Sequence, residues 1–294
     1  MQNLFAYHIG ALVPNPLDPR AFTSRSPQKV NGSKEVHIFS VGTLHGRTLV
    51  IYTTKKEADS VFHIVEPVFD KITERPKASS SLVPSMLSRR NKSSWFRAYR
   101  DFSLLGECYD VIFLKAKIVA LCSTGFEVLE LIGMKRVNIP QSDKNLAPIA
   151  QRCKSCRPLG MFRCSNDEFL LCYDEFGVHV NKNGAISRAG VIEWEGKANR
   201  VALHAPYILL FNTSFIEIRK FDTGQLSQIF PGTEIQCVWD GRGAGSIATA
   251  STEGTVNREP LVHAVMNLEK LPDVPARGIT QHVFELVPVL PAPT

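Results

Sequence analysis

Cysteines supply the residue types and spacing in this sequence that could support metal or redox chemistry. Cys153 and Cys156 form a Cys-x-x-Cys pair, which is a common half of a zinc site. Cys164 and Cys172 are eight residues apart in segments that resemble strands, so they do not supply the second half. The pair also does not open a helix after a strand, as a thioredoxin-like redox pair does. We therefore expect no metal, no redox centre and no cofactor.

Motifs for hydrolysis and phosphate binding do not appear either. The eight histidines are scattered without metal-binding spacing, so each is expected to be an ordinary strand or loop residue. The stretch 241–245 (GRGAG) lacks the Lys and Ser/Thr of a phosphate loop, and we interpret it as a flexible turn. Trp239-Asp240 resembles the dipeptide of WD repeats, but no Gly-His pair precedes it at the repeat spacing. The sequence predicts no catalytic residues, and an enzyme of unknown type is the third hypothesis.

Basic residues gather in and just after one polar segment. Residues 71–94 are dominated by serine and basic residues with two prolines, which is typical of a disordered insertion. The run 89–94 (RRNKSS) would also suit an acidic partner or a basophilic kinase, so docking and phosphorylation remain alternatives to simple solvation. The candidate partner-binding residues are Arg89, Arg90, Lys92, Arg97 and Arg100.

Short strands are the elements that must position these residues. From 170 to 230, apolar runs of about four to seven residues alternate with Gly, Asn and Asp turns. Asn183-Gly184 and Thr223-Gly224 supply the positive-φ positions that tight hairpins need. This pattern predicts a meander of antiparallel strands, that is, a sandwich, a barrel or a propeller.

The same rhythm continues over most of the chain. We expect about twenty strands, which at four per blade make about five blades. The polar stretches 11–34, 140–157 and 270–280 are expected to be connectors. Strands flank the connectors at 4–9, 36–42, 48–53, 60–65, 95–131, 159–194, 199–230, 234–240, 246–251, 261–268 and 282–289. Nearly continuous apolar runs, such as 118–122, indicate sheets that are covered on both faces.

Composition limits the class of protein. With 294 residues, of which 44% are hydrophobic, the chain is long enough for one all-β domain with a real core. The net charge of +6 is too mild for a dedicated nucleic-acid binder. No apolar run is long enough for a transmembrane segment, and the N-terminus lacks the pattern of a secretory signal. Most of the seven cysteines lie in apolar runs, as buried reduced thiols of a cytoplasmic protein do.

Several motifs in sequence carry a family resemblance. Together they resemble a citron homology (CNH) domain, most closely the version in fungal guanine-nucleotide exchange factors for Rho-type GTPases. The motifs are FGVHVN (176–181), IEWEG (192–196), HAPYILLF (204–211), FIEIR (215–219) and the Thr223-Gly224 turn. The likeness extends over 42–65, 96–131 and 281–287. No single motif is catalytic, so the resemblance depends on their order and spacing.

The resemblance implies an all-β fold, a seven-bladed β-propeller of four-stranded antiparallel blades. With about five blades of sequence, we expect the propeller to be N-terminally incomplete. One CNH-type domain is expected over 1–294, with the disordered insertion near 71–94.

The function that the resemblance implies is regulatory. We expect a non-enzymatic protein-interaction domain of a Rho GTPase guanine-nucleotide exchange factor, acting in cell-wall integrity and polarity signalling. Its partners would be a Rho-family small GTPase or the factor's own Dbl-homology catalytic module, with no nucleic acid. Such a domain would be cytoplasmic and recruited to the plasma membrane at growth sites through these partners. The alternative is a CNH scaffold of a vacuolar sorting or vesicle-tethering protein.

Overall fold

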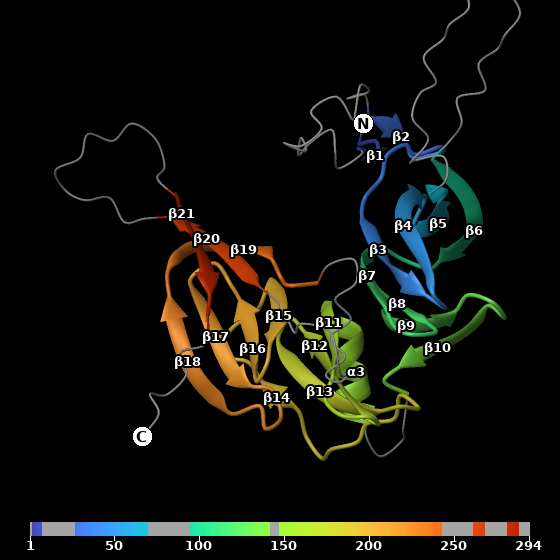
Figure 1. The fold of residues 1–294 in the computed structure, drawn as a ribbon. Helices are drawn as coiled ribbons and strands as arrows, with labels where there is room; N and C mark the ends of the chain where they lie inside the picture. The colour runs from blue at the N-terminus through green and yellow to red at the C-terminus, as the bar shows by residue number, and fades with distance from the viewer. Residues whose placement is uncertain are drawn as a thin grey trace, which may run out of the picture. The chain divides into compact units, whose positions relative to one another are not determined.

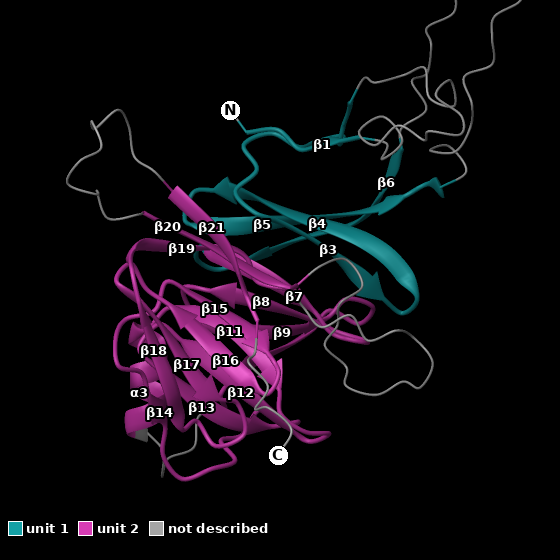
Figure 2. Cartoon of the chain, turned by 60° about the vertical axis from the view of Figure 1, so that its left-hand side comes forward, with its two compact units in different colours: residues 1–107 teal, residues 108–294 magenta. Residues whose placement is uncertain are grey.

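A computed structural model describes residues 2–7, 27–69, 95–141, 147–242, 261–267 and 281–287. The chain divides into two compact units, residues 1–107 and 108–294, which are coloured separately in Figure 2. The predicted insertion at 71–94 lies outside the described residues, and the assignment of one domain to 1–294 stays a prediction.

Unit 1 is built around one four-stranded antiparallel sheet with the order β3-β4-β5-β6 (Figure 1). A two-residue turn at His45-Gly46 joins β3 to β4, and both residues have positive φ, as a tight hairpin turn requires. A two-stranded sheet, β1-β2, accompanies it, and β2 lies inside the expected connector 11–34. The strands are β1 (Phe5–Ala6), β2 (Gln28–Lys29), β3 (Phe39–Leu44), β4 (Arg47–Lys56), β5 (Asp59–Pro67) and β6 (Phe96–Leu104).

Unit 2 contains three four-stranded antiparallel sheets and one described with three strands. Its first sheet is formed by β7 (Cys108–Phe113), β8 (Ile118–Cys122), β9 (Gly125–Glu130) and β10 (Lys135–Ile139). Its second sheet is formed by β11 (Pro158–Arg163), β12 (Glu168–Tyr173), β13 (Phe176–Asn181) and β14 (Ile192–Glu193). The third sheet is formed by β15 (Arg200–His204), β16 (Tyr207–Phe211), β17 (Phe215–Lys220) and β18 (Leu226–Pro231). The fourth is described with β19 (Thr233–Trp239), β20 (Val262–Asn267) and β21 (Gln281–Leu286).

Successive sheets of unit 2 pack against each other. Strand β11 contacts β7 and β8 of the preceding sheet and β15 of the following one, and β19 contacts β16 and β17. One apolar cluster fills the space between the first two sheets, with Phe126 and Tyr173 in edge-to-face contact. Two further clusters lie between the second and third sheets and between the third and fourth. Strand β8 is consequently buried at every residue, as its continuous apolar sequence predicts.

The predicted fold class, all-β with four-stranded antiparallel blades, is confirmed. The interpretation of 140–157 as a connector is wrong for its second half, where helix α3 (Ala147–Ser155) forms. Half-buried Ile149 and buried Cys153 are four residues apart, so they occupy one helical face against the apolar cluster between the first two sheets. The expected strand at 246–251 lies outside the described residues. No helix within the described ranges is long and apolar enough to cross a membrane.

Candidate partner-binding surface

Two of the five candidate partner-binding residues lie on β6, which is an outer strand of its sheet among the described strands. Arg97 has an exposed side chain, and its guanidinium donates through Nε (2.8 Å) and Nη2 (2.6 Å) to Oε2 of Glu66 on β5. Arg47 on β4 approaches the same carboxylate oxygen at 3.9 Å. The charge of Arg97 is therefore partly balanced by a neighbour within its own sheet.

Arg100 is half-buried and lies opposite Ile64 in the β5–β6 register. Its neighbour Asp101 approaches Nδ1 of His63 at 3.3 Å, and the His63 ring stacks on Tyr52 with ring centroids 5.0 Å apart. Burial and the charge of Asp101 both raise the pKa of Tyr52. The β6 side of unit 1 thus presents both signs of charge, and is less basic than the arginines alone predict.

The remaining candidates, Arg89, Arg90 and Lys92, lie outside the described residues. The role of all five residues in partner binding stays a prediction.

The sequence did not reveal a second charged cluster, which lies in unit 2. Asp240 is buried, and its Oδ2 accepts hydrogen bonds from Arg200 Nη2 (2.7 Å) and Arg242 Nη2 (2.7 Å). Arg242 Nη2 also donates to Asp110 on β7 at 2.8 Å. Two arginines and two carboxylates thereby join β7, β15 and the segment after β19, which are far apart in the sequence.

The electrostatics of this cluster are mutually supporting. Burial alone would raise the pKa of Asp240, but the neighbouring guanidinium groups of Arg242 and Arg200 hold that pKa below its ordinary value. Likewise, Asp110 and Asp240 raise the pKa of Arg242 despite its burial. Gly241-Arg242, the described part of the expected flexible turn, is accordingly held in place by the ion pairs of Arg242. In the sequence, the Trp239-Asp240 dipeptide was the one feature that pointed to this cluster.

The cysteines of the Cys-x-x-Cys pair do not meet the downstream cysteines. Cys153 and Cys156 face the cluster between the first two sheets, whereas Cys164 and Cys172 face the cluster between the second and third. A four-cysteine zinc site is therefore not assembled by these residues. None of the seven cysteines, all of which the structure describes, forms a disulfide bond.

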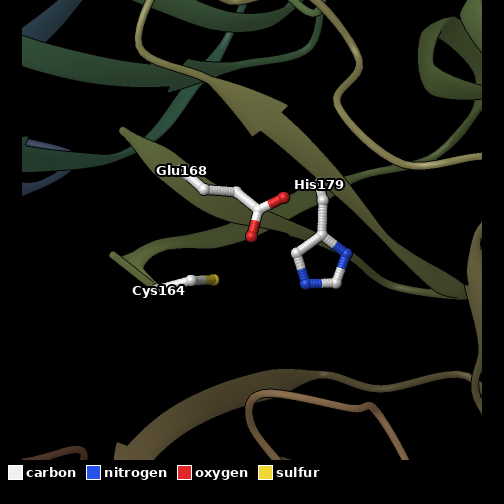
Figure 3. A group of neighbouring side chains, drawn as sticks. All are labelled: Cys164, Glu168 and His179. Atoms are coloured by element: carbon white, nitrogen blue, oxygen red, sulfur yellow. The ribbon is translucent and has the colours of Figure 1, made fainter. Parts of the chain in front are cut away.

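In the described part of the chain, two mixed groups of side chains have atoms close enough to hold a metal ion. One group is Cys156, Asp174 and Glu175, where the ammonium of Lys197 lies 3.0 Å from Asp174 and 3.3 Å from Glu175. The single Lys197 ammonium offsets part of the charge of the two carboxylates, and neither carboxylate has a buried oxygen without a hydrogen-bond partner among the described residues. The other group is Cys164, Glu168 and His179, whose side chains converge in Figure 3.

Comparison with known proteins identifies the family to which the chain belongs. A family model described as the CNH domain matches residues 1–241. The Schizosaccharomyces pombe protein "Rho1 guanine nucleotide exchange factor 1" is 30% identical over 271 residues, which are 90% of this chain and 20% of that protein. Factor 2 of the same organism is 30% identical over 262 residues, which are 87% of this chain and 21% of that protein. The chain thus spans about a fifth of the length of these relatives.

A solved structure is similar over nearly the whole chain. The AfRom2 CNH domain superposes with a TM-score of 0.68 at 25% sequence identity, covering 97% of this chain and 74% of that one. The family resemblance predicted from the strand motifs is confirmed by both comparisons. On the strength of the family match over 1–241, this chain belongs to the CNH domain family.

Proposed function

We propose that this chain serves as a regulatory, non-catalytic interaction domain of a Rho-type guanine-nucleotide exchange factor. Its partner is a Rho-family GTPase or the factor's own Dbl-homology catalytic module, at the cytoplasmic face of the plasma membrane during wall growth. The observation that carries the proposal is the CNH match over 1–241 together with relatives named Rho1 exchange factors along about nine-tenths of the chain. Those names belong to much longer proteins, and their activity comes to this chain only through the proposal.

Strand β6 is the surface that we assign to the partner. Strand β6 is an outer strand of its sheet among the described strands, and a sheet edge is a common place for a partner segment to bind. Arg97 and Arg100 add positive charge there, and opposite charge on a partner raises the association rate. The cluster of Asp110, Arg200, Asp240 and Arg242 suits this role less, because its two positive and two negative groups balance each other.

Association kinetics test this assignment. A Rho-type GTPase, loaded with GDP or a GTP analogue, is immobilised and the chain is passed over it at several salt concentrations. We expect binding that weakens as salt rises, since exposed charges are screened. The double variant Arg97→Glu/Arg100→Glu should slow association more than it speeds dissociation.

A matched control is available on another outer strand. Lys135 and Arg136 are exposed on β10, so the variant Lys135→Glu/Arg136→Glu makes the same change in net charge elsewhere. If both double variants slow association equally, the effect is one of net charge, and the assignment to β6 is wrong. If the chain binds the GTPase in neither nucleotide state, the GTPase is not its partner.

A further inference from the structure

The group of Cys164, Glu168 and His179 is assembled by strand pairing in the second sheet of unit 2. Leu170 on β12 lies opposite His179 on β13, so these two side chains share one face of the sheet. Glu168 is two residues before Leu170 and therefore lies on that face too. Cys164 follows β11 at the hairpin that leads into β12, where its backbone N–H donates to the Glu168 carbonyl at 2.9 Å. Potential ligand atoms of the three side chains all lie within 4.8 Å of one another.

His179 is the feature of the group that ordinary packing does not explain. The residue is only 3% exposed, and its Nε2 has no hydrogen-bond partner among the described residues. A buried polar atom without a partner is costly and is rare in folded proteins. Figure 3 shows an imidazole nitrogen on the side of the ring that faces the thiol and the carboxylate. Burial, aided by the charge of Arg188, lowers the pKa of His179, so the ring is held in the neutral form that binds metals.

Glu168 is held as an oriented carboxylate. Its Oε1 accepts from Ser187 Oγ at 2.7 Å and Arg188 Nε at 3.0 Å, and its Oε2 accepts from Arg188 Nη2 at 2.6 Å. One lone pair of Oε2 is left for a further ligand. Hydrogen bonds of this kind to a ligating carboxylate fix its direction in metal sites.

We propose that Cys164, Glu168 and His179 form a binding site for a zinc-class divalent transition metal ion, with water as the fourth ligand. Sulfur and imidazole ligands select zinc and its neighbours over Mg²⁺ and Ca²⁺, which prefer all-oxygen sites. Three protein ligands and one water complete the tetrahedral geometry of zinc.

Metal binding requires the Cys164 thiol to lose its proton to solvent, as the sulfur forms its bond to the metal. Burial and the charge of Glu168 raise the pKa of Cys164 to about 12, so without metal the thiol stays protonated. Thiolate and carboxylate then supply two negative charges to the ion, while the Arg188 guanidinium, which is paired with Glu168, adds one positive charge beside them. Zinc ligand atoms lie about 3.5 Å apart, which follows from bond lengths of about 2.0 and 2.3 Å, so the group must contract slightly. Cys164 is partly buried and lies at the turn after β11, where a side-chain movement of that size is small.

Cobalt spectroscopy of the full chain tests the site. After chelator treatment, Co²⁺ is titrated and the sulfur-to-cobalt charge-transfer band is followed. We expect a band that saturates at about one equivalent, disappears in Cys164→Ser and is displaced by Zn²⁺. Glu168→Gln and His179→Gln should each weaken binding by at least about tenfold, because each removes one ligand.

Cys156→Ser is the matched control, since Cys156 belongs to the other Cys-carboxylate group. It should leave the band unchanged. No band in the wild-type chain, a band that survives Cys164→Ser, or a band lost in Cys156→Ser would overturn the proposal. Circular dichroism of each metal-free variant checks its folding. Zn²⁺ should raise the melting temperature of the wild-type chain but not of Cys164→Ser, and an equal rise in both would mean adventitious binding only.

Discussion

Replacing one partner of the buried ion pair between Glu217 and Arg219 should destabilise unit 2 strongly, whereas replacing both should not. The Glu217 side chain is 1% exposed and that of Arg219 is 9% exposed, and the two groups form a direct hydrogen bond on β17. Arg219 also donates to the Gly224 carbonyl at 2.9 Å and to Glu195 at 3.1 Å. Its guanidinium lies 5.7 Å from the centre of the Trp194 ring.

The two single variants differ in what they leave behind. Arg219→Met leaves the Glu217 carboxylate buried, with the backbone N–H of Glu195 at 2.9 Å as a donor to it. An uncompensated buried charge of this kind costs about 3–5 kcal/mol. Glu217→Leu should cost less, because Arg219 keeps the Gly224 carbonyl and the half-exposed Glu195 carboxylate. The double variant Glu217→Leu/Arg219→Met removes both charges, and should lie close to the wild-type stability.

Urea denaturation followed by tryptophan fluorescence measures these differences, since Trp194 lies beside the pair. The control is Lys182→Met, which breaks the exposed pair with Asp167 (2.9 Å, side chains 64% and 68% exposed) and should cost about 0–1 kcal/mol. A double variant as unstable as the sum of the single variants would refute the reasoning, since the two charges would then act independently.

Three further predictions follow from burial and charge. Leu210→Ala should lower the free energy of unfolding by about 2–5 kcal/mol, because Leu210 is 2% exposed in a central strand. The control Leu226→Ala, on the exposed strand β18, should change that free energy by about 0.5 kcal/mol or less. Urea denaturation measures both. The stability of the metal-free chain should fall as the pH drops below about 6.5. Buried His179 faces Arg188, Glu168 and Cys164, and its pKa is lowered in the folded chain. The unfolded chain therefore takes up a proton at this histidine at a higher pH than the folded chain does, which favours unfolding. Melting temperatures of His179→Gln should show a flatter dependence on pH in this window. Asp240 has a lowered pKa as well, so Asp240→Asn should remove stability at neutral pH that the wild-type chain loses only in acid, well below pH 5.

The succession of strands and turns in 170–230 could be predicted from the sequence because residues close together in the chain determine it. Asn181 Oδ1 accepts from the backbone N–H groups of Asn183 and Ala185, and Gly184 takes a φ of 86°, so the turn is set by residues within one short segment. Apolar residues then follow one another almost without interruption along β12 and β16, as strands that are covered on both faces require. Such signals depend on neighbours in sequence, and are therefore visible without the structure.

Elements whose formation depends on residues far away in the sequence could not be predicted from the sequence. Strand β10 was missed because four of its five residues are exposed, and its pairing with β9 rather than its composition makes it a strand. Helix α3 was missed because few apolar residues mark its buried face. The pairing of Arg97 with Glu66 depends on the β5–β6 register, which shifts between Ile64 and Val65. For the same reason, the sequence spacing of Cys164, Glu168 and His179 gave no sign that they meet.

A pull-down with the immobilised chain tests the central claim most directly. The chain is offered a Rho-type GTPase in the GDP and GTP-analogue states, a Dbl-homology catalytic module, and a vesicle-trafficking GTPase as comparator. We expect the chain to retain the Rho-type GTPase or the catalytic module, and not the comparator. Retention of the comparator alone, or of none of the four, would contradict the exchange-factor role and favour the vesicle-tethering scaffold.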